Sequence, residues 1–141
     1  MNTYKNKNIL FIVLIFILLI QISFFIQAKN NDQIIGRLTI KEAYDKIQEN
    51  KNNPDLVILD VRTRDEFKEG HIENAINIDY YSKSLKKNLN KLDKNKTYLV
   101  YCRSGSRSAK TVAIMEELGF KEVYNIGGMM DWTAAGYPSV K

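Results

Sequence analysis

The chain has 141 residues, enough for one domain plus an extension, and its 45% apolar and 26% charged residues are ordinary for a globular protein. The net charge of +5 is mild and no run of basic residues is interleaved with aromatic ones, so nucleic acid is not expected as a partner. The single cysteine excludes an internal disulfide framework, and with a single histidine the chain has too few ligands for a structural zinc site.

Residues 1–28 form a segment of their own. Lys5 and Lys7 precede an apolar stretch over residues 9–26 that only Gln21 and Ser23 interrupt. A positive end followed by such a stretch is typical of a secretory signal peptide. Its 18 residues also span about 27 Å as a helix at roughly 1.5 Å per residue, so an uncleaved membrane anchor is the alternative. Either interpretation places the remaining chain outside the cytoplasm, in the periplasm or cell envelope.

Residues 29–36 are predicted to be a polar linker, and residues 37–141 the folded domain. Thr39 and Glu42 fit a helix-capping box, so a helix is expected from there to about residue 50. A short unbroken apolar run, 56–59, predicts a strand that is covered on both faces. A second capping box, 63–66, predicts a short helix that stops before residue 70.

Strand-like and helix-like segments keep alternating through the rest of the chain. The expected elements are a strand at 75–78, a lysine-rich surface helix at 82–92, a strand at 97–101, a helix at 109–118, a strand at 123–126 and a short helix that carries Trp132. Such alternation predicts an α/β domain around a mainly parallel sheet.

The only cysteine lies where a predicted strand ends and a predicted helix begins, in the stretch Cys102–Ser108. A helix N-terminus presents unpaired N–H groups and a partial positive charge, and both favour a thiolate. Arg103 and Arg107 are expected to act in the same direction. We therefore predict that Cys102 is a catalytic nucleophile. The alternative is an inert cysteine packed at a strand end.

Several further segments, together with this loop, resemble a single-domain rhodanese of the exported bacterial type. They are Asp60-Val61-Arg62, Glu66-Phe67, Gly70-His71-Ile72, Ala75-Ile76-Asn77-Ile78, and Gly127-Gly128 with Trp132. The resemblance covers roughly residues 37–139. It implies a three-layer α/β sandwich around a parallel sheet, and an enzyme that transfers a sulfane sulfur from a donor such as thiosulfate to cyanide or a thiol through a persulfide. It implies no metal and no organic cofactor.

Under this resemblance, Cys102 would carry the persulfide and the loop would bind the substrate. The expected substrate-binding residues are Arg103, Ser104, Gly105, Ser106, Arg107 and Ser108. For Arg107 the alternative is a structural tie across the loop, and for Arg103 a solvated position at its rim. Ser108 is expected to cap the helix, to donate a hydrogen bond to the sulfur, or both.

Other polar residues are expected to be structural. Asp60 and Arg62 could serve acid–base chemistry, but sulfane transfer needs no proton acceptor, so a buried ion pair in support of the site is favoured. His71 belongs to a turn remote from the nucleophile in the resembling family, which argues against a Cys–His dyad. Trp132 and the pair Tyr80-Tyr81 are expected to pack in the core or at the rim.

Three rival functions stay open. The domain could be a persulfide carrier for an acceptor protein with little turnover of small donors, or a redox sensor. A cysteine phosphatase or arsenate reductase is less favoured, because related phosphatases place an arginine six residues beyond the cysteine, where this chain has Ser108. A monomer is expected, with membrane contact only through residues 9–26 if these are not cleaved.

Overall fold

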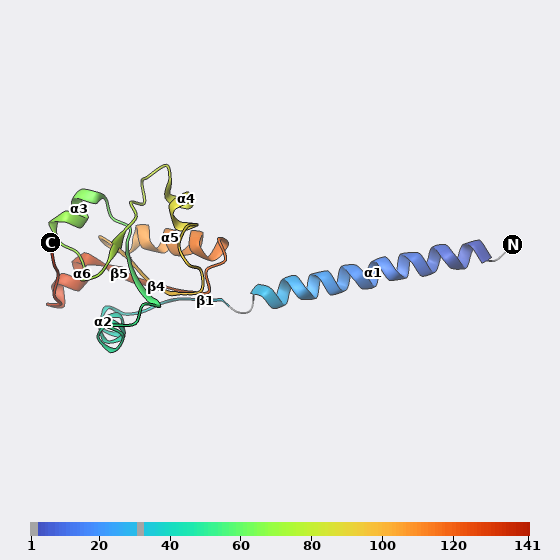
Figure 1. The fold of residues 1–141 in the computed structure, drawn as a ribbon, viewed down its shortest axis with the longest axis horizontal. Helices are drawn as coiled ribbons and strands as arrows, with labels where there is room; N and C mark the ends of the chain where they lie inside the picture. The colour runs from blue at the N-terminus through green and yellow to red at the C-terminus, as the bar shows by residue number, and fades with distance from the viewer. Residues whose placement is uncertain (1–2, 31–32) are drawn as a thin grey trace. The chain divides into compact units, whose positions relative to one another are not determined.

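The computed structural model describes residues 3–30 and 33–141 (Figure 1). The chain divides into two compact units, Met1–Asp32 and Gln33–Lys141. The first unit contains one helix, α1 (Thr3–Asn30), and its apolar side chains from Ile9 to Ile20 are exposed. Among the residues that the structure describes, no helix has the length and apolar character needed to cross a membrane. The signal-peptide or anchor role of residues 1–28 stays a prediction, and residues 1–2 and 31–32 lie outside the described residues.

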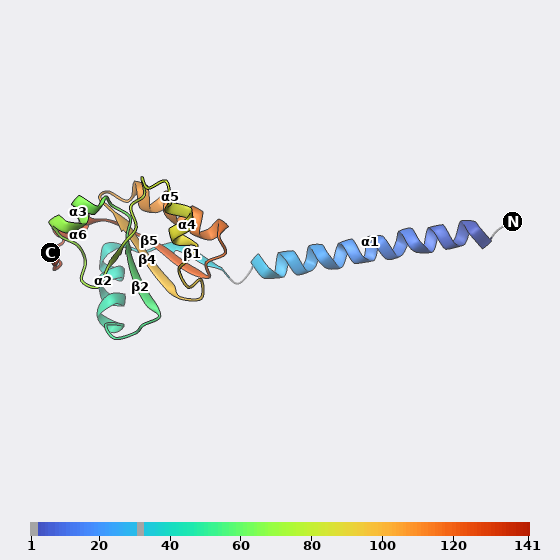
Figure 2. The same ribbon diagram turned by 45° about the horizontal axis from the view of Figure 1, so that its top comes forward.

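The second unit is built on five parallel strands in the order β1-β5-β4-β2-β3 (Figure 2). This confirms the predicted α/β class with a parallel sheet. The strands are β1 (Ile34–Arg37), β2 (Leu56–Asp60), β3 (Ile76–Asn77), β4 (Thr97–Cys102) and β5 (Glu122–Gly128). β4 is almost wholly buried because β2 and β5 flank it and helices cover both of its faces.

Helices lie on both sides of this sheet. α2 (Ile40–Glu49) and α5 (Ser106–Glu117) lie on opposite sides of it (Figure 1). Alternate residues of β4 supply the two cores: Tyr98, Val100 and Cys102 belong to one cluster, while Leu99 and Tyr101 belong to the other. The first cluster contains residues of α5 and α4 (Leu85–Leu89), and the second contains residues of α2 and α6 (Met129–Ala134). The arrangement is the predicted three-layer sandwich.

Both predicted capping boxes are present. Thr39 Oγ1 accepts from the Glu42 N–H at 3.2 Å, and the Glu42 carboxylate accepts from the Thr39 N–H at 2.8 Å, so α2 begins at Ile40. The same pair of bonds, 3.3 Å and 3.0 Å, joins Thr63 and Glu66 and starts α3 (Arg64–Glu69). Each such cap is worth about 1 kcal/mol of helix stability.

Part of the predicted linker is wrong, because residues 34–37 form β1 rather than a loose connection. Four residues with no clear alternation become a strand only because β5 offers them a parallel partner, with Ile34 opposite Glu122. The predicted surface helix at 82–92 is shorter, since only Leu85–Leu89 are helical. Leu85 and Leu89 lie one helical turn apart and are both buried, so these five residues pack against the sheet as a short helix.

Candidate active site

Cys102 is the last residue of β4 and lies directly in front of the N-terminus of α5. A three-residue turn, Arg103–Gly105, separates the strand from the helix, and the cysteine side chain is buried, with 1% of the residue exposed. Gly105 has φ = 94°, a left-handed conformation that glycine adopts without strain. This conformation directs the Gly105 N–H at the Cys102 Sγ, 3.1 Å away. The predicted strand–loop–helix geometry is therefore present, with a backbone donor aimed at the sulfur.

The surroundings of Cys102 favour a thiolate. Burial raises the pKa of the Cys102 thiol, but hydrogen bonds from the Ser108 hydroxyl and from the N–H groups of Ser108, Ser104 and Gly105 outweigh it, so the pKa is lowered. The Ser108 contribution requires its hydroxyl hydrogen to point at the sulfur, 3.5 Å away. Backbone N–H groups at the helix N-terminus provide the remaining hydrogen bonds, as the sequence predicted. Of the two arginines that were expected to act in the same direction, Arg107 interacts with the charge of Cys102.

Arg107 is bound to an acid from another helix. Its two terminal nitrogens donate to the two carboxylate oxygens of Glu66 in α3, each at 2.8 Å, and its guanidinium lies 5.5 Å from the centre of the Tyr81 ring. The Arg107 hydrogen bonds lower the pKa of Glu66 to about 2. The negative charge of Cys102 is a smaller cause of the raised Arg107 pKa than Glu66 is. The arginine therefore forms the structural tie that the sequence left as an alternative to substrate contact.

Arg103 is exposed and forms no ion pair among the described residues. Its carbonyl accepts from the Met130 N–H at 3.1 Å, which fixes the backbone of the turn against α6. Its side chain lines a hollow of about 640 Å³, together with Arg62, Glu66, Glu69, Met129, Met130, Thr133 and Ala134. The Arg103 guanidinium, one residue after Cys102, is therefore available to bind an anion.

Ser108 lies inside the first turn of α5 rather than at its N-cap, so the expected capping role is wrong. The helix begins three residues earlier than its apolar pattern indicated, and Gly105 is the N-cap. The buried Ser108 hydroxyl lies 2.8 Å from Oδ1 of Asn125 and 3.0 Å from the Gly105 carbonyl oxygen. Sequence reasoning missed Asn125, although an amide inside the apolar strand 123–126 is a signal that a buried polar partner is required.

The end of β5 fits closely against the same turn. The pairing of β4 with β5 shifts by one residue, since Val100 is opposite Asn125 while Cys102 is opposite Gly128. A Cβ on Gly128 would lie 2.6 Å from the Ser104 Cα and would collide with the Arg103 carbonyl group. Gly128 is therefore required for the close approach of the two loops, while Gly127 has φ = 91°, a left-handed conformation that favours glycine.

Asp60 and Arg62 form a buried ion pair at 2.7 Å, with 0% and 6% of these residues exposed. Arg62 also donates to the Gly70 carbonyl at 2.6 Å, so the pair holds the turn that follows α3. His71 lies in this turn, with Nδ1 2.9 Å from the Phe67 carbonyl oxygen and its ring stacked on Phe67 at 3.7 Å. These contacts are structural.

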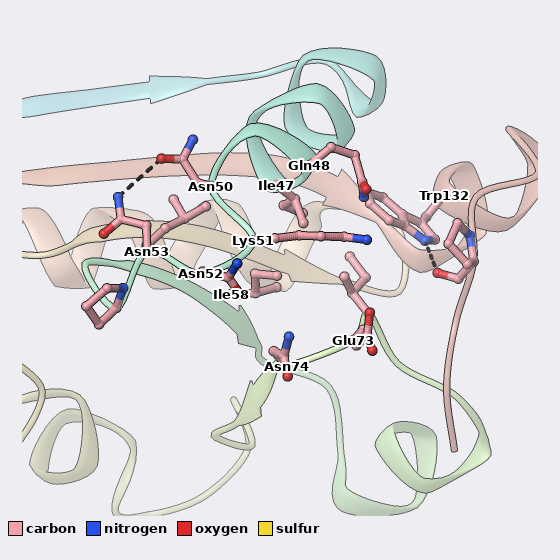
Figure 3. Close-up of a pocket in the computed structure, with 14 residues that line it drawn as sticks. Ile47, Gln48, Asn50, Lys51, Asn52, Asn53, Ile58, Glu73, Asn74 and Trp132 are labelled. Carbon is pink, nitrogen blue, oxygen red and sulfur yellow. Dashed lines mark hydrogen bonds between the residues drawn. The ribbon is translucent and has the colours of Figure 1, made fainter.

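A second hollow, of about 430 Å³, lies between the end of α2, the loop that follows it, and the turn at residues 72–74 (Figure 3). Figure 3 shows Lys51 extending across it toward Trp132, whose indole N–H donates to the Pro138 carbonyl at 2.9 Å. No residue of the stretch 102–108 lines this hollow. The hollow is therefore separate from the candidate active site.

The folded domain thus has a parallel sheet covered on both faces and a buried cysteine at a helix N-terminus. This is the arrangement that the resemblance to a rhodanese implies. Residues 40–135 match the family of the rhodanese-like domain, and the chain belongs to this family.

Several individual proteins are similar to this chain. The thiosulfate sulfurtransferase GlpE of Coxiella burnetii (strain RSA 331 / Henzerling II) is 43% identical over 81 residues, which cover 57% of this chain and 74% of that protein. YtwF of Bacillus subtilis (strain 168) is 38% identical over 84 residues, 60% of this chain and 80% of that protein. The crystal structure of a rhodanese-related protein from Thermoplasma volcanium superposes with a TM-score of 0.63 at 33% identity, over 74% of this chain and 96% of that one.

Proposed function

We propose that this protein is a sulfurtransferase that moves a sulfane sulfur from a donor such as thiosulfate to cyanide or a thiol, through a persulfide on Cys102. The observation that carries the proposal is the buried Cys102 sulfur with the Gly105 N–H aimed at it from 3.1 Å. The similarity to a thiosulfate sulfurtransferase over 81 residues supports the same activity.

The reaction takes place in two displacements at sulfur. The Cys102 thiolate attacks the outer sulfur of thiosulfate, a new S–S bond forms, and the old S–S bond breaks with its electron pair leaving on sulfite. The acceptor then attacks the outer sulfur of the persulfide, and Cys102 leaves as a thiolate. Neither step requires a protein side chain to remove a proton. The N–H groups of the loop stabilise the anionic sulfur throughout, as preorganised donors do in oxyanion holes.

Arg103 supplies the cation that meets the sulfonate-like end of thiosulfate, since its guanidinium has no ion-pair partner among the described residues. Ser104 and Ser106 are exposed at the mouth of the loop and add hydroxyl donors. Arg107 acts indirectly in this scheme, because Glu66 occupies both of its terminal nitrogens.

The direct test is thiosulfate:cyanide turnover with the wild-type chain and with Cys102→Ser. The variant should lose all turnover, and the wild-type protein should gain the mass of one sulfur atom after exposure to thiosulfate. Wild-type turnover in the variant would refute the mechanism. A persulfide that forms but is not released to cyanide or to small thiols would instead support the alternative of a carrier for an acceptor protein.

The proposal includes a location outside the cytoplasm, in the periplasm or the cell envelope. It rests on Lys5 and Lys7 in front of the apolar residues 9–26. Fractionation of cells that express the full chain tests it, because export predicts the protein in the envelope fraction. Intact mass of that fraction then separates a cleaved signal peptide from a retained anchor, and a protein found only in the cytosol would end the proposal.

A further inference from the structure

The side chain of Asn125 in β5 joins three parts of the active-site loops. Its Oδ1 accepts from the Ser108 hydroxyl at 2.8 Å and from the Gly127 N–H at 3.0 Å, and its Nδ2 donates to the Gly105 carbonyl at 3.3 Å. Asn125 does not contact the sulfur itself, and the sulfur-transfer scheme makes no use of it. Its partners, however, are the glycine whose N–H binds Cys102 and the serine that lies beside it.

The Gly127 N–H fixes the orientation of the Asn125 amide. A backbone N–H can only donate, so the atom that faces it must be the amide oxygen. Turning the amide over would place two donors against each other at Gly127 and two oxygens against each other at Gly105. The oxygen of Asn125 is therefore held toward Ser108 as a hydrogen-bond acceptor.

The Ser108 hydroxyl has one hydrogen and more than one acceptor. Asn125 Oδ1 lies 2.8 Å from Ser108 Oγ, the carbonyl oxygens of Gly105 and Gly127 lie 3.0 Å and 3.4 Å away, and Cys102 Sγ lies 3.5 Å away. If the hydrogen points at the sulfur, the lone pairs of two oxygens face each other at the 2.8 Å contact, which is unfavourable in a buried site. The hydrogen bond that Ser108 can give to a thiolate is thus in competition with the one it gives to Asn125.

From this geometry we infer that Asn125 is a positioning residue for the nucleophile: it competes for the single Ser108 proton and so weakens the hydrogen bond that Ser108 gives to the Cys102 sulfur. The backbone N–H groups around the sulfur do not depend on this competition, because they do not move with a side-chain rotamer. The inference rests on the proposed role of Cys102 as the nucleophile. It adds a residue that sets how readily the thiol ionises.

The test is the pH dependence of alkylation of Cys102, the only cysteine, in the full chain. In Asn125→Ala, Ser108 keeps the carbonyl oxygens of Gly105 and Gly127 and the Cys102 sulfur as acceptors. The thiolate is the charged and therefore the strongest acceptor among them, so the thiol pKa should fall by about one pH unit. In Asn125→Asp, a carboxylate holds the proton more strongly and adds a negative charge, so the thiol pKa should rise by about one unit or more. Loosening of the loop alone would shift both variants in the same direction.

Ser108→Ala supplies the coupling test. Alone it should not lower the thiol pKa, and combined with Asn125→Ala it should abolish the fall. Asn77→Ala is a matched control, because Asn77 is also half-buried on a strand and donates to two backbone carbonyls, those of Asp60 and Arg62, without reaching Ser108. It should leave the thiol pKa unchanged.

The charged groups around the loop are Arg103, Arg107, Glu66 and Asp131. They are the same in the alanine variants, so they do not produce the expected difference in thiol pKa. A thiol pKa that is unchanged or raised in Asn125→Ala overturns the inference, and so does a fall that persists without Ser108. Alkylation needs no sulfur donor, so failure of thiosulfate turnover alone would refute the proposed function and leave this result standing.

Discussion

Glu66→Gln isolates the ion pair that joins α3 to α5. Glu66 takes part in two interactions, the capping box with Thr63 and the bidentate ion pair with Arg107. Glutamine can replace glutamate in a capping box, so the cap should survive the substitution. The amide group of glutamine, however, offers only one oxygen to Arg107 and turns a donor toward the other guanidinium nitrogen. The substitution therefore removes the ion pair and leaves a largely buried cation without its partner.

The structure sets the size of the effect. The two bonds are 2.8 Å long and the side chains of Arg107 and Glu66 are only 15% and 25% exposed, so screening by water reduces but does not cancel their contribution. Charge-assisted bonds of this kind contribute about 1.5–3 kcal/mol. We expect Glu66→Gln to lose about 2 kcal/mol of unfolding free energy at pH 7, which corresponds to a fall in Tm of roughly 10 °C.

The pH dependence gives a second readout. A carboxyl whose pKa is lowered to about 2 in the folded state stabilises that state at every pH above its unfolded value, near about 4.3, and the contribution disappears as the pH falls toward the folded value. In urea unfolding, the stability gap between wild type and Glu66→Gln should thus be full at pH 7 and should narrow below about pH 4.5.

Asp45→Asn is the matched control, because Asp45 forms an exposed ion pair with Lys41 one helical turn away. That variant should leave the unfolding midpoint almost unchanged. A Glu66→Gln protein as stable as wild type at pH 7, or a gap of constant size from pH 7 down to the acid transition, would refute the assignment of the Glu66–Arg107 pair as a structural tie.

Three further substitutions test the site and its support. Asp60→Asn should destabilise the domain by about 3–5 kcal/mol in urea unfolding, because it leaves the buried Arg62 cation unpaired, and a smaller loss than about 1 kcal/mol would contradict this. Gly128→Ala places a methyl group against the Arg103 carbonyl, so thiol reactivity of Cys102 should fall even at temperatures where circular dichroism shows a folded protein. Gly36→Ala is the control, because its methyl group would make tight contacts of 3.3–3.4 Å with the Tyr124 side chain and not with the active-site loop, so it should leave the reactivity intact. Arg103→Gln should raise the KM for thiosulfate about tenfold with little change in the rate of cyanide attack on the persulfide, and an unchanged KM would remove Arg103 from the substrate site.

Local signals in the sequence predicted most of the fold. The capping boxes at Thr39 and Thr63 depend on residues three positions apart, and the buried strand over residues 56–59 depends on an unbroken apolar run, so each is visible in a short window. β1 was missed for the opposite reason. Its four residues are strand-like only in the presence of β5, which lies more than eighty positions further along the chain.

Some features of the candidate site could likewise be predicted from neighbouring residues, and others could not. The position of Cys102 at the end of a strand and before a helix follows from the neighbouring residues. The partner of Arg107 does not, since Glu66 lies 41 residues away and a free arginine and a paired one look alike in sequence. Asn125 and Ser108 are 17 residues apart and meet only because the β4–β5 register brings them together.

The strand order has a consequence for how the domain forms. β5 lies between β1 and β4, yet it is the last strand to be synthesised, and β1 has no other strand partner in the sheet described for residues 33–141. Pairing Ile34 with Glu122 closes a loop of nearly the whole domain, and such non-local pairing slows folding. The strand Ile34–Arg37 must therefore wait, unpaired, until β5 (Glu122–Gly128) has left the ribosome.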